Sequence, residues 1–204
     1  TFKEPFLTSS KEKPYVLATN HETIGLYLYT YNPIENIWEK VSDINYNNDF
    51  RIFLSNVRII YSEFNDEIYG VTNAANGGNF FKINIASGNV TQLKNLPSFN
   101  NKNFYSGVCF SYEKDIYFIS GKYLNEIWQY NTANDSWSLF NETPFYDNSF
   151  FDRGYNVCIN VIDNFAYFNN GAEGNQYSDF WKLNLETKDW TRLADNPNPN
   201  KKST

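Results

Sequence analysis

The chain has 204 residues, of which 41% are hydrophobic and 20% charged, a balance typical of a packed globular protein rather than of a disordered one. Mean hydropathy is -0.58, and no apolar run approaches the roughly 18 residues that a membrane-spanning helix requires. The net charge of -6 argues against a surface for non-specific binding of nucleic-acid phosphates.

Aromatic residues and asparagine dominate the composition. The chain holds 18 Phe, 16 Tyr, 5 Trp and 32 Asn, but only one His and no Met. Aromatic side chains favour strands, whereas Asn favours the turns between them. The composition therefore predicts many short strands joined by many turns, with no indication of helices.

A pattern of two apolar residues, one polar residue, one apolar residue and Asn, with small departures, occurs four times along the chain. The spacings between the Asn residues are 52, 47 and 53, and the sixth residue after each Asn is Trp in three copies and Val in one. A period of about 50 residues predicts a repeat architecture. The four segments are Leu28–Asn32, Phe80–Asn84, Ile127–Asn131 and Phe180–Asn184, followed by Trp38, Val90, Trp137 and Trp190.

Each repeat is expected to contain four antiparallel strands. The alternation before the Asn predicts a strand, the Asn suits an Asx-type turn, and the Trp or Val begins the next strand. Upstream apolar runs predict two further strands in every repeat. Their ranges are Phe6–Thr8, Ile59–Tyr61, Gly107–Cys109 and Asn156–Cys158 for the first strand, then Tyr15–Asn20, Ile68–Asn73, Ile116–Gly121 and Ala166–Gly171 for the second.

The two cysteines lie 49 residues apart, close to the repeat length. We therefore expect Cys109 and Cys158 to occupy equivalent places on the innermost strands of successive repeats, as small, buried, reduced thiols. Their number and spacing match neither a disulfide framework nor a zinc-binding motif.

Four-stranded repeats of this length are typical of an all-β fold, the β-propeller, in which each repeat forms one blade. We expect blades at about residues 1–41, 56–93, 104–140 and 154–193, followed by a linker or disordered tail at 194–204. Trp38, Trp137 and Trp190 should be buried between blades. With four repeats visible, the chain forms a small ring, part of a larger propeller, or a propeller completed by a partner chain.

The third and fourth repeats resemble kelch repeats. The resemblance rests on Asp115–Gly121, Asn125–Asn131 with Trp137, and on Ser178–Asn184 with Trp190–Leu193. It covers essentially the whole chain and is nearest to kelch-type repeats of bacterial surface proteins, which favours a secreted or cell-surface location over a cytoplasmic one. The double Gly of the family is reduced to Ser120-Gly121 and Asn170-Gly171. The family includes adaptor proteins as well as sugar-modifying enzymes, so it implies the fold more than the function.

Candidate catalytic and cofactor residues are few. His21 is the single imidazole and is expected in an exposed loop, which excludes a multi-histidine metal site. No phosphate-binding glycine motif occurs, so we expect no nucleotide, transition metal or other cofactor. Asp147 and Asp152 share one loop, where they could serve a sugar-active enzyme as a carboxylate pair or hold calcium.

Three long connections between successive repeats emerge on one face of the predicted propeller, together with the loops between the second and third strands. They carry aromatic residues and Arg among short polar residues, the composition of recognition surfaces. The alternative is that these aromatic rings fold inward and cap the blades. The expected ligand-binding residues are Tyr46, Phe50, Arg51, Phe99, Tyr146, Phe150, Phe151, Arg153 and Tyr177.

The sequence thus predicts a non-enzymatic binding module that contacts a protein partner through its loop face. Carbohydrate binding on the same face is the alternative, because sugars stack on aromatic rings and bond to amides. A sugar-modifying enzyme is a third hypothesis. No nucleic-acid partner and no membrane span are expected.

Overall fold

The computed structural model describes residues 3–9, 13–20, 25–45, 57–72, 79–97, 108–119, 126–144, 158–169 and 179–195. These residues form sixteen β-strands and no helix. The strands are β1 (Lys3–Ser9), β2 (Pro14–Asn20), β3 (Gly25–Asn32), β4 (Ile37–Asp43), β5 (Arg58–Ser62), β6 (Glu67–Val71), β7 (Phe80–Asn84), β8 (Val90–Gln92), β9 (Val108–Tyr112), β10 (Asp115–Ile119), β11 (Glu126–Asn131), β12 (Ser136–Glu142), β13 (Cys158–Ile162), β14 (Phe165–Asn169), β15 (Phe180–Asn184) and β16 (Trp190–Arg192).

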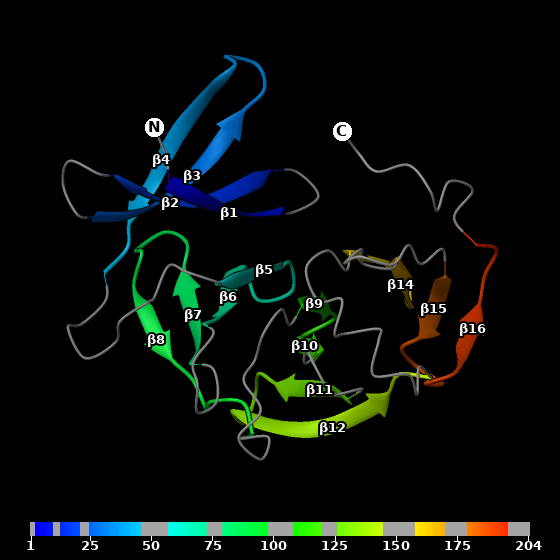
Figure 1. The fold of residues 1–204 in the computed structure, drawn as a ribbon. Helices are drawn as coiled ribbons and strands as arrows, with labels where there is room; N and C mark the ends of the chain where they lie inside the picture. Colours follow the sequence, from blue (N-terminus) through cyan, green and yellow to red (C-terminus); the bar gives the residue numbers. More distant parts are fainter. Residues whose placement is uncertain are drawn as a thin grey trace.

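Every four consecutive strands form one antiparallel sheet, and we call these sheets blades 1 to 4 in chain order. Figure 1 shows the blades arranged around a common centre, from blade 1 in blue to blade 4 in orange. The first strands of the blades lie innermost and next to one another in the order β1, β5, β9 and β13. The predicted all-β propeller with four four-stranded blades is confirmed.

The repeated Asn of each blade closes the turn between the third and fourth strands. Asn131 Oδ1 accepts hydrogen bonds from the N–H groups of Ala133 at 3.0 Å and Asn134 at 3.3 Å, and the Asn residues of the other blades accept equivalent bonds. The fourth residue after each Asn has a positive φ: Asn36 at 56°, Gly88 at 68°, Asp135 at 50° and Lys188 at 66°. The predicted Asx turns are therefore present in all four blades.

Gly88 shows why this turn also matters for blade packing. A Cβ atom at this position would clash with the backbone carbonyl oxygen of Asp43 in blade 1. Because Gly88 has no side chain, its carbonyl oxygen can accept a hydrogen bond from the Asn45 N–H at 2.9 Å. The turn of blade 2 thereby fits directly against the last strand of blade 1.

Three apolar cores lie between successive blades. Leu28 of blade 1 packs with Phe81 and Ile83 of blade 2, and both Leu28 and Phe81 are fully buried. Phe80 of blade 2 packs in the same way with Tyr130 of blade 3. The third core joins Ile127, Phe140 and neighbouring residues of blade 3 to Phe168 and Leu183 of blade 4. Opposite faces of one blade therefore contribute to different cores.

Polar contacts at the outer edges clamp each blade to the preceding one. Trp137 Nε1 donates to the carbonyl oxygen of Lys94 at 2.8 Å, and the Lys94 N–H donates to Asp135 Oδ1 at 2.8 Å. Trp190 Nε1 likewise donates to the Glu142 carbonyl oxygen of blade 3 at 3.0 Å. The repeated Trp thus joins the backbone of the preceding blade through a specific hydrogen bond.

The expected burial of Trp38 is wrong. Trp38 stands at the same repeat position as Trp137 and Trp190, but it is 45% exposed. Ile37 and Ile34 beside it are also exposed, at 46% and 94%. Blade 1 has no preceding blade among the described residues, so nothing covers this ring except Tyr31, at 5.2 Å between ring centres. Trp137 and Trp190 are half-buried, each packed against the core that its blade shares with the preceding one, so the predicted burial is partial even there.

The expected equivalence of Cys109 and Cys158 is also wrong. In the strand register Cys109 lies opposite Phe118, whereas Cys158 lies opposite Asn169. Phe118 and Phe168 are equivalent residues, because their partners Trp128 and Trp181 precede the repeated Asn by the same distance. Ile159, opposite Phe168, is therefore the equivalent of Cys109. The two cysteines are one residue out of register.

We predict that Trp190→Ala lowers the free energy of unfolding by about 3 to 5 kcal/mol, because it removes a ring from the core of blades 3 and 4 and leaves the Glu142 carbonyl group without its donor. Trp38→Ala, the matched control, should cost less than about 1 kcal/mol. Urea denaturation of both variants measures the difference, and equal losses would show that the described inter-blade contacts do not determine stability.

Candidate binding face

The propeller has two ends with different construction. We call the end that bears the tight hairpin turns the turn face, and the opposite end, where strands join residues 21–24, 46–56, 73–78, 98–107, 120–125, 145–157 and 170–178, the connection face. All nine predicted ligand-binding residues belong to these connections and lie outside the described residues: Tyr46, Phe50, Arg51, Phe99, Tyr146, Phe150, Phe151, Arg153 and Tyr177. His21, Asp147 and Asp152 lie outside them as well. Their roles stay predictions.

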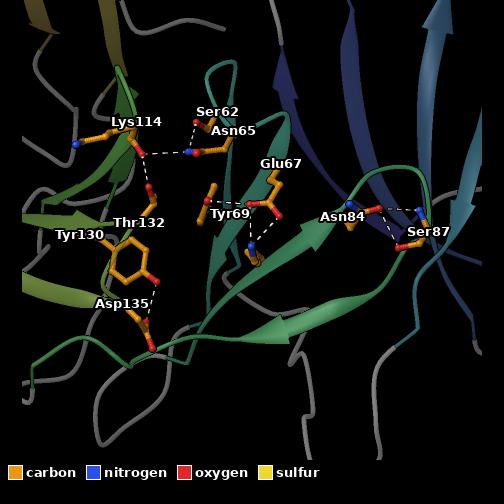
Figure 2. Close-up of polar contacts among 11 residues, drawn as sticks. Ser62, Asn65, Glu67, Tyr69, Asn84, Ser87, Lys114, Tyr130, Thr132 and Asp135 are labelled. Atoms are coloured by element: carbon orange, nitrogen blue, oxygen red, sulfur yellow. Dashed lines mark hydrogen bonds and ion pairs between the residues drawn. The ribbon is translucent and has the colours of Figure 1, made fainter.

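On the turn face, polar side chains are occupied by contacts within the protein. Asn65 Nδ2 of blade 2 donates to the Lys114 carbonyl oxygen of blade 3 at 3.0 Å, and Thr132 Oγ1 donates to the same oxygen at 2.9 Å. Figure 2 shows these bonds together with that of the Tyr130 hydroxyl group, which donates to Asp135 Oδ1 at 2.7 Å. The turns of blades 2 and 3 are therefore held together by the groups that could otherwise contact a ligand.

Buried hydroxyl groups without a partner lie at or just beyond the ends of strands in three blades. Ser42 near the end of β4, Thr72 after β6 and Thr143 after β12 are each at most 8% exposed. Among the described residues, their hydroxyl oxygen atoms have no hydrogen-bond partner. One carboxylate oxygen atom of Asp115, at the turn-face end of β10, is also buried and has no hydrogen-bond partner among these residues. Ser42 lies against Gly88 in the turn of blade 2, and Glu142, next to Thr143, bonds to Trp190 of blade 4, so these hydroxyl groups lie at contacts between blades rather than on one face. Buried polar groups are normally paired, so the three groups are hydrogen-bonding capacity that the described scaffold does not use.

Ion pairs and charge-assisted hydrogen bonds fix the strand ends around the connection face. Arg192 Nη2 lies 2.9 Å from Asp195 Oδ1 and 3.3 Å from Asp179 Oδ1, which joins the end of β16 to Asp179, the residue that follows 170–178. Trp128 Nε1 donates to Glu126 Oε2 at 2.9 Å beside residues 120–125. These contacts anchor the positions where the predicted binding loops begin and end.

The Cys109 thiol and four buried or partly buried tyrosine hydroxyl groups have raised pKa values. Burial raises the pKa of the Cys109 thiol to about 12, although the nearby Arg58 guanidinium group acts in the opposite direction. Burial also raises the pKa of Tyr61 to about 12, with Asp66 adding to the shift, and raises those of Tyr69, Tyr117 and Tyr130. These groups are therefore protonated, and the described part of the chain holds no cluster of metal-ligating side chains.

Comparison with known proteins supports the fold. No family model matches the chain, and no curated protein sequence matches it. The structure of YjhT is similar at 12% identity, with a TM-score of 0.67 over 97% of this chain and 67% of that one. An exo-beta-1,3-galactanase from Clostridium thermocellum is similar at 11% identity, with a TM-score of 0.59 over 94% of this chain and 48% of the enzyme. An oligogalacturonate lyase in complex with manganese is similar at 8% identity, with a TM-score of 0.54 over 93% of this chain and 52% of the lyase.

These comparisons place the chain in the class of β-propellers. The chain spans about two thirds of YjhT and about half of the galactanase and the lyase. At such low identity the likeness establishes the fold alone. No helix in the described part of the chain has the length and apolar character needed to cross a membrane.

We predict that the protein loses stability as the pH rises above about 10. The folded state holds the hydroxyl protons of Tyr61, Tyr69, Tyr117 and Tyr130 more tightly than the unfolded state, whose tyrosines ionise near 10.0. This stabilisation is complete below pH 10 and is lost as the pH approaches the raised values.

Absorbance at 295 nm and far-UV circular dichroism, followed together during an alkaline titration, measure this effect. We expect a fraction of the tyrosines to ionise only as the strand signal disappears, and Tyr130→Phe to reduce that fraction. Ionisation of every tyrosine near pH 10 with the strand signal unchanged would show that these hydroxyl groups are not buried.

Proposed function

We propose that the protein is a kelch-like, non-enzymatic binding module that contacts a protein partner through the connection face. The observation that carries the proposal is the difference between the two faces. Turn-face groups bond to one another and across to the neighbouring blade, whereas the connections that carry the predicted aromatic and Arg residues all join strand ends at the connection face. Loops on a rigid scaffold are where binding residues are usually found.

The composition of the connections supports a protein partner. A few Tyr, Phe, Trp and Arg residues typically supply most of the binding energy of a protein interface, and aromatic rings lose little entropy when they become ordered. The proposed contact residues are those predicted from the sequence: Tyr46, Phe50, Arg51, Phe99, Tyr146, Phe150, Phe151, Arg153 and Tyr177.

A carbohydrate ligand is the second candidate for the same face. The observation in its favour is that two similar propellers are named for sugar substrates, the galactanase and the oligogalacturonate lyase. An enzymatic role would need a carboxylate pair such as Asp147 and Asp152. A glycan array separates this candidate from the first, because a protein-binding module would bind no glycan on it.

We predict that the double variant Phe150→Ala, Phe151→Ala weakens partner binding by at least about 1 to 2 kcal/mol while leaving the melting temperature nearly unchanged, as expected for exposed anchor residues. Isothermal titration calorimetry with a partner isolated from the native source measures the effect. Phe64→Ala is the matched control, because this ring is 70% exposed on the turn face.

Equal affinities of the double variant and the Phe64→Ala variant would contradict the proposal. A double variant that melts much earlier and still binds normally when folded would instead identify Phe150 and Phe151 as rings that cap the blades.

A further inference from the structure

One position of the innermost strands breaks the apolar pattern of the repeat. Arg58 is the first residue of β5 and lies opposite Val71. The equivalent residue of blade 3 is Val108, which lies opposite Ile119 and packs against the core between blades 3 and 4. Blade 2 therefore carries a guanidinium group where the next blade uses a valine. A residue that departs from the local rule without a structural gain is a signal of function.

The position of Arg58 faces blade 3 at the centre of the propeller. Val71, opposite Arg58, belongs to the core between blades 2 and 3, and Cys109 of β9 packs against that core. Ile60, two residues further along β5 and on the same face of the strand, packs against that core, and β5 lies next to β9. Because β5 begins at the connection face, Arg58 stands where β5 and β9 meet that face.

Arg58 has no carboxylate partner among the described residues. Its guanidinium group makes one hydrogen bond there, from Nη1 to the Val57 carbonyl oxygen at 3.3 Å. By contrast, Arg192 is paired with Asp179 and Asp195, and Lys82 with Glu67. A guanidinium group has five N–H donors in a planar fork, so most of those of Arg58 are available to a ligand.

Because Arg58 is partly buried, leaving its guanidinium group without a negatively charged partner destabilises the unliganded protein. The residue is half-buried, and removing a cation from water without a counter-charge costs free energy. The adjacent Cys109 thiol is protonated and gives no compensation. An anion bound at Arg58 would neutralise the charge and use the free donors.

We propose that Arg58 binds a carboxylate group of the ligand at the connection-face opening between blades 2 and 3. A planar carboxylate matches the guanidinium fork with two parallel hydrogen bonds, a geometry that lysine cannot reproduce. The inference rests on the proposed function, since it assigns a chemical group to the ligand of the same face. An acidic sugar and an acidic amino-acid side chain both supply this group.

Nuclear magnetic resonance titration of the full chain tests the proposal with four small probes. Galacturonate and N-acetylglutamate N-methylamide carry the carboxylate, whereas galactose and N-acetylglutamine N-methylamide are their neutral counterparts. We expect saturable shifts of the Arg58 Nε–H signal with one or both acids at about 10 mM or below and none with the neutral probes. The acid that binds more tightly distinguishes a sugar source from a protein source.

Substitution then assigns the binding to Arg58. Arg58→Gln should weaken the binding of the acid at least tenfold, and Arg58→Lys should retain part of it. Arg192→Gln, which removes an exposed and already paired guanidinium group, should leave it unchanged. Thermal melting confirms that each variant folds. If the Arg58→Gln variant does not fold, the comparison of acidic with neutral probes on the unaltered protein still tests whether Arg58 binds a carboxylate group.

Equal shifts with acids and neutral probes, no shift with either acid, or full retention of binding in a folded Arg58→Gln variant would overturn the proposal. The proposed function has its own test. A partner that binds the unaltered protein and the Arg58→Gln variant equally would leave the binding module intact and remove only the role of Arg58. If the acids bind at Arg58 but no protein partner is found, the role of Arg58 stands and the protein-binding function does not.

Discussion

The contact between successive blades is the interaction on which the rest of this structure depends. A single four-stranded sheet has two faces and cannot bury both of them alone. Blades 2 and 3 therefore each place one face in the core with the preceding blade and the other face in the core with the next one. The outer edges add specific hydrogen bonds, such as that from the Trp137 indole to the backbone of blade 2. Stacking of this kind fixes the strand ends that carry the connections.

The same packing explains why the two ends of the propeller differ. The turn-face residues have two structural roles, since the repeated Asn closes its own hairpin and Asn65, in another turn, bonds across to the next blade. Such turns tolerate little change. The connections between blades carry no comparable repeat of sequence, so they are free to vary in length and composition. A rigid core with one invariant end and one variable end is a suitable arrangement for a binding module.

The architecture could be predicted from the sequence because its cause is local and repeated. The Asn and the alternation before it are required by one hairpin, so they recur in every blade, and a Trp follows in three of the four. The exposure of Trp38 could not be predicted in this way, since it depends on a neighbouring blade rather than on the repeat itself. The misplaced cysteine register has another cause. The cysteines are 49 residues apart, close to the repeat length, but equivalent residues of the first two strands in blades 3 and 4, such as Phe118 and Phe168, are 50 apart, so Cys158 falls one residue short.

The predicted ligand-binding residues all belong to the connections outside the described residues, and the structure shows only the strand ends that carry them. Arg58 was missed because no motif marks it. Arg58 stands out only when the innermost strands are aligned by their register, because the equivalent residue of blade 3 is then Val108.

The central claim is that the repeated Trp of blades 3 and 4 joins each of these blades to the one before it. Hydrogen exchange of the indole N–H groups, followed by nuclear magnetic resonance, tests it most directly. The indole N–H groups of Trp137 and Trp190 donate to carbonyl oxygen atoms of the preceding blades, whereas that of Trp38 has no acceptor among the described residues. We expect Trp137 and Trp190 to exchange at least about tenfold more slowly than Trp38, because exchange requires the blades to separate. Equally fast exchange of all three would contradict the account.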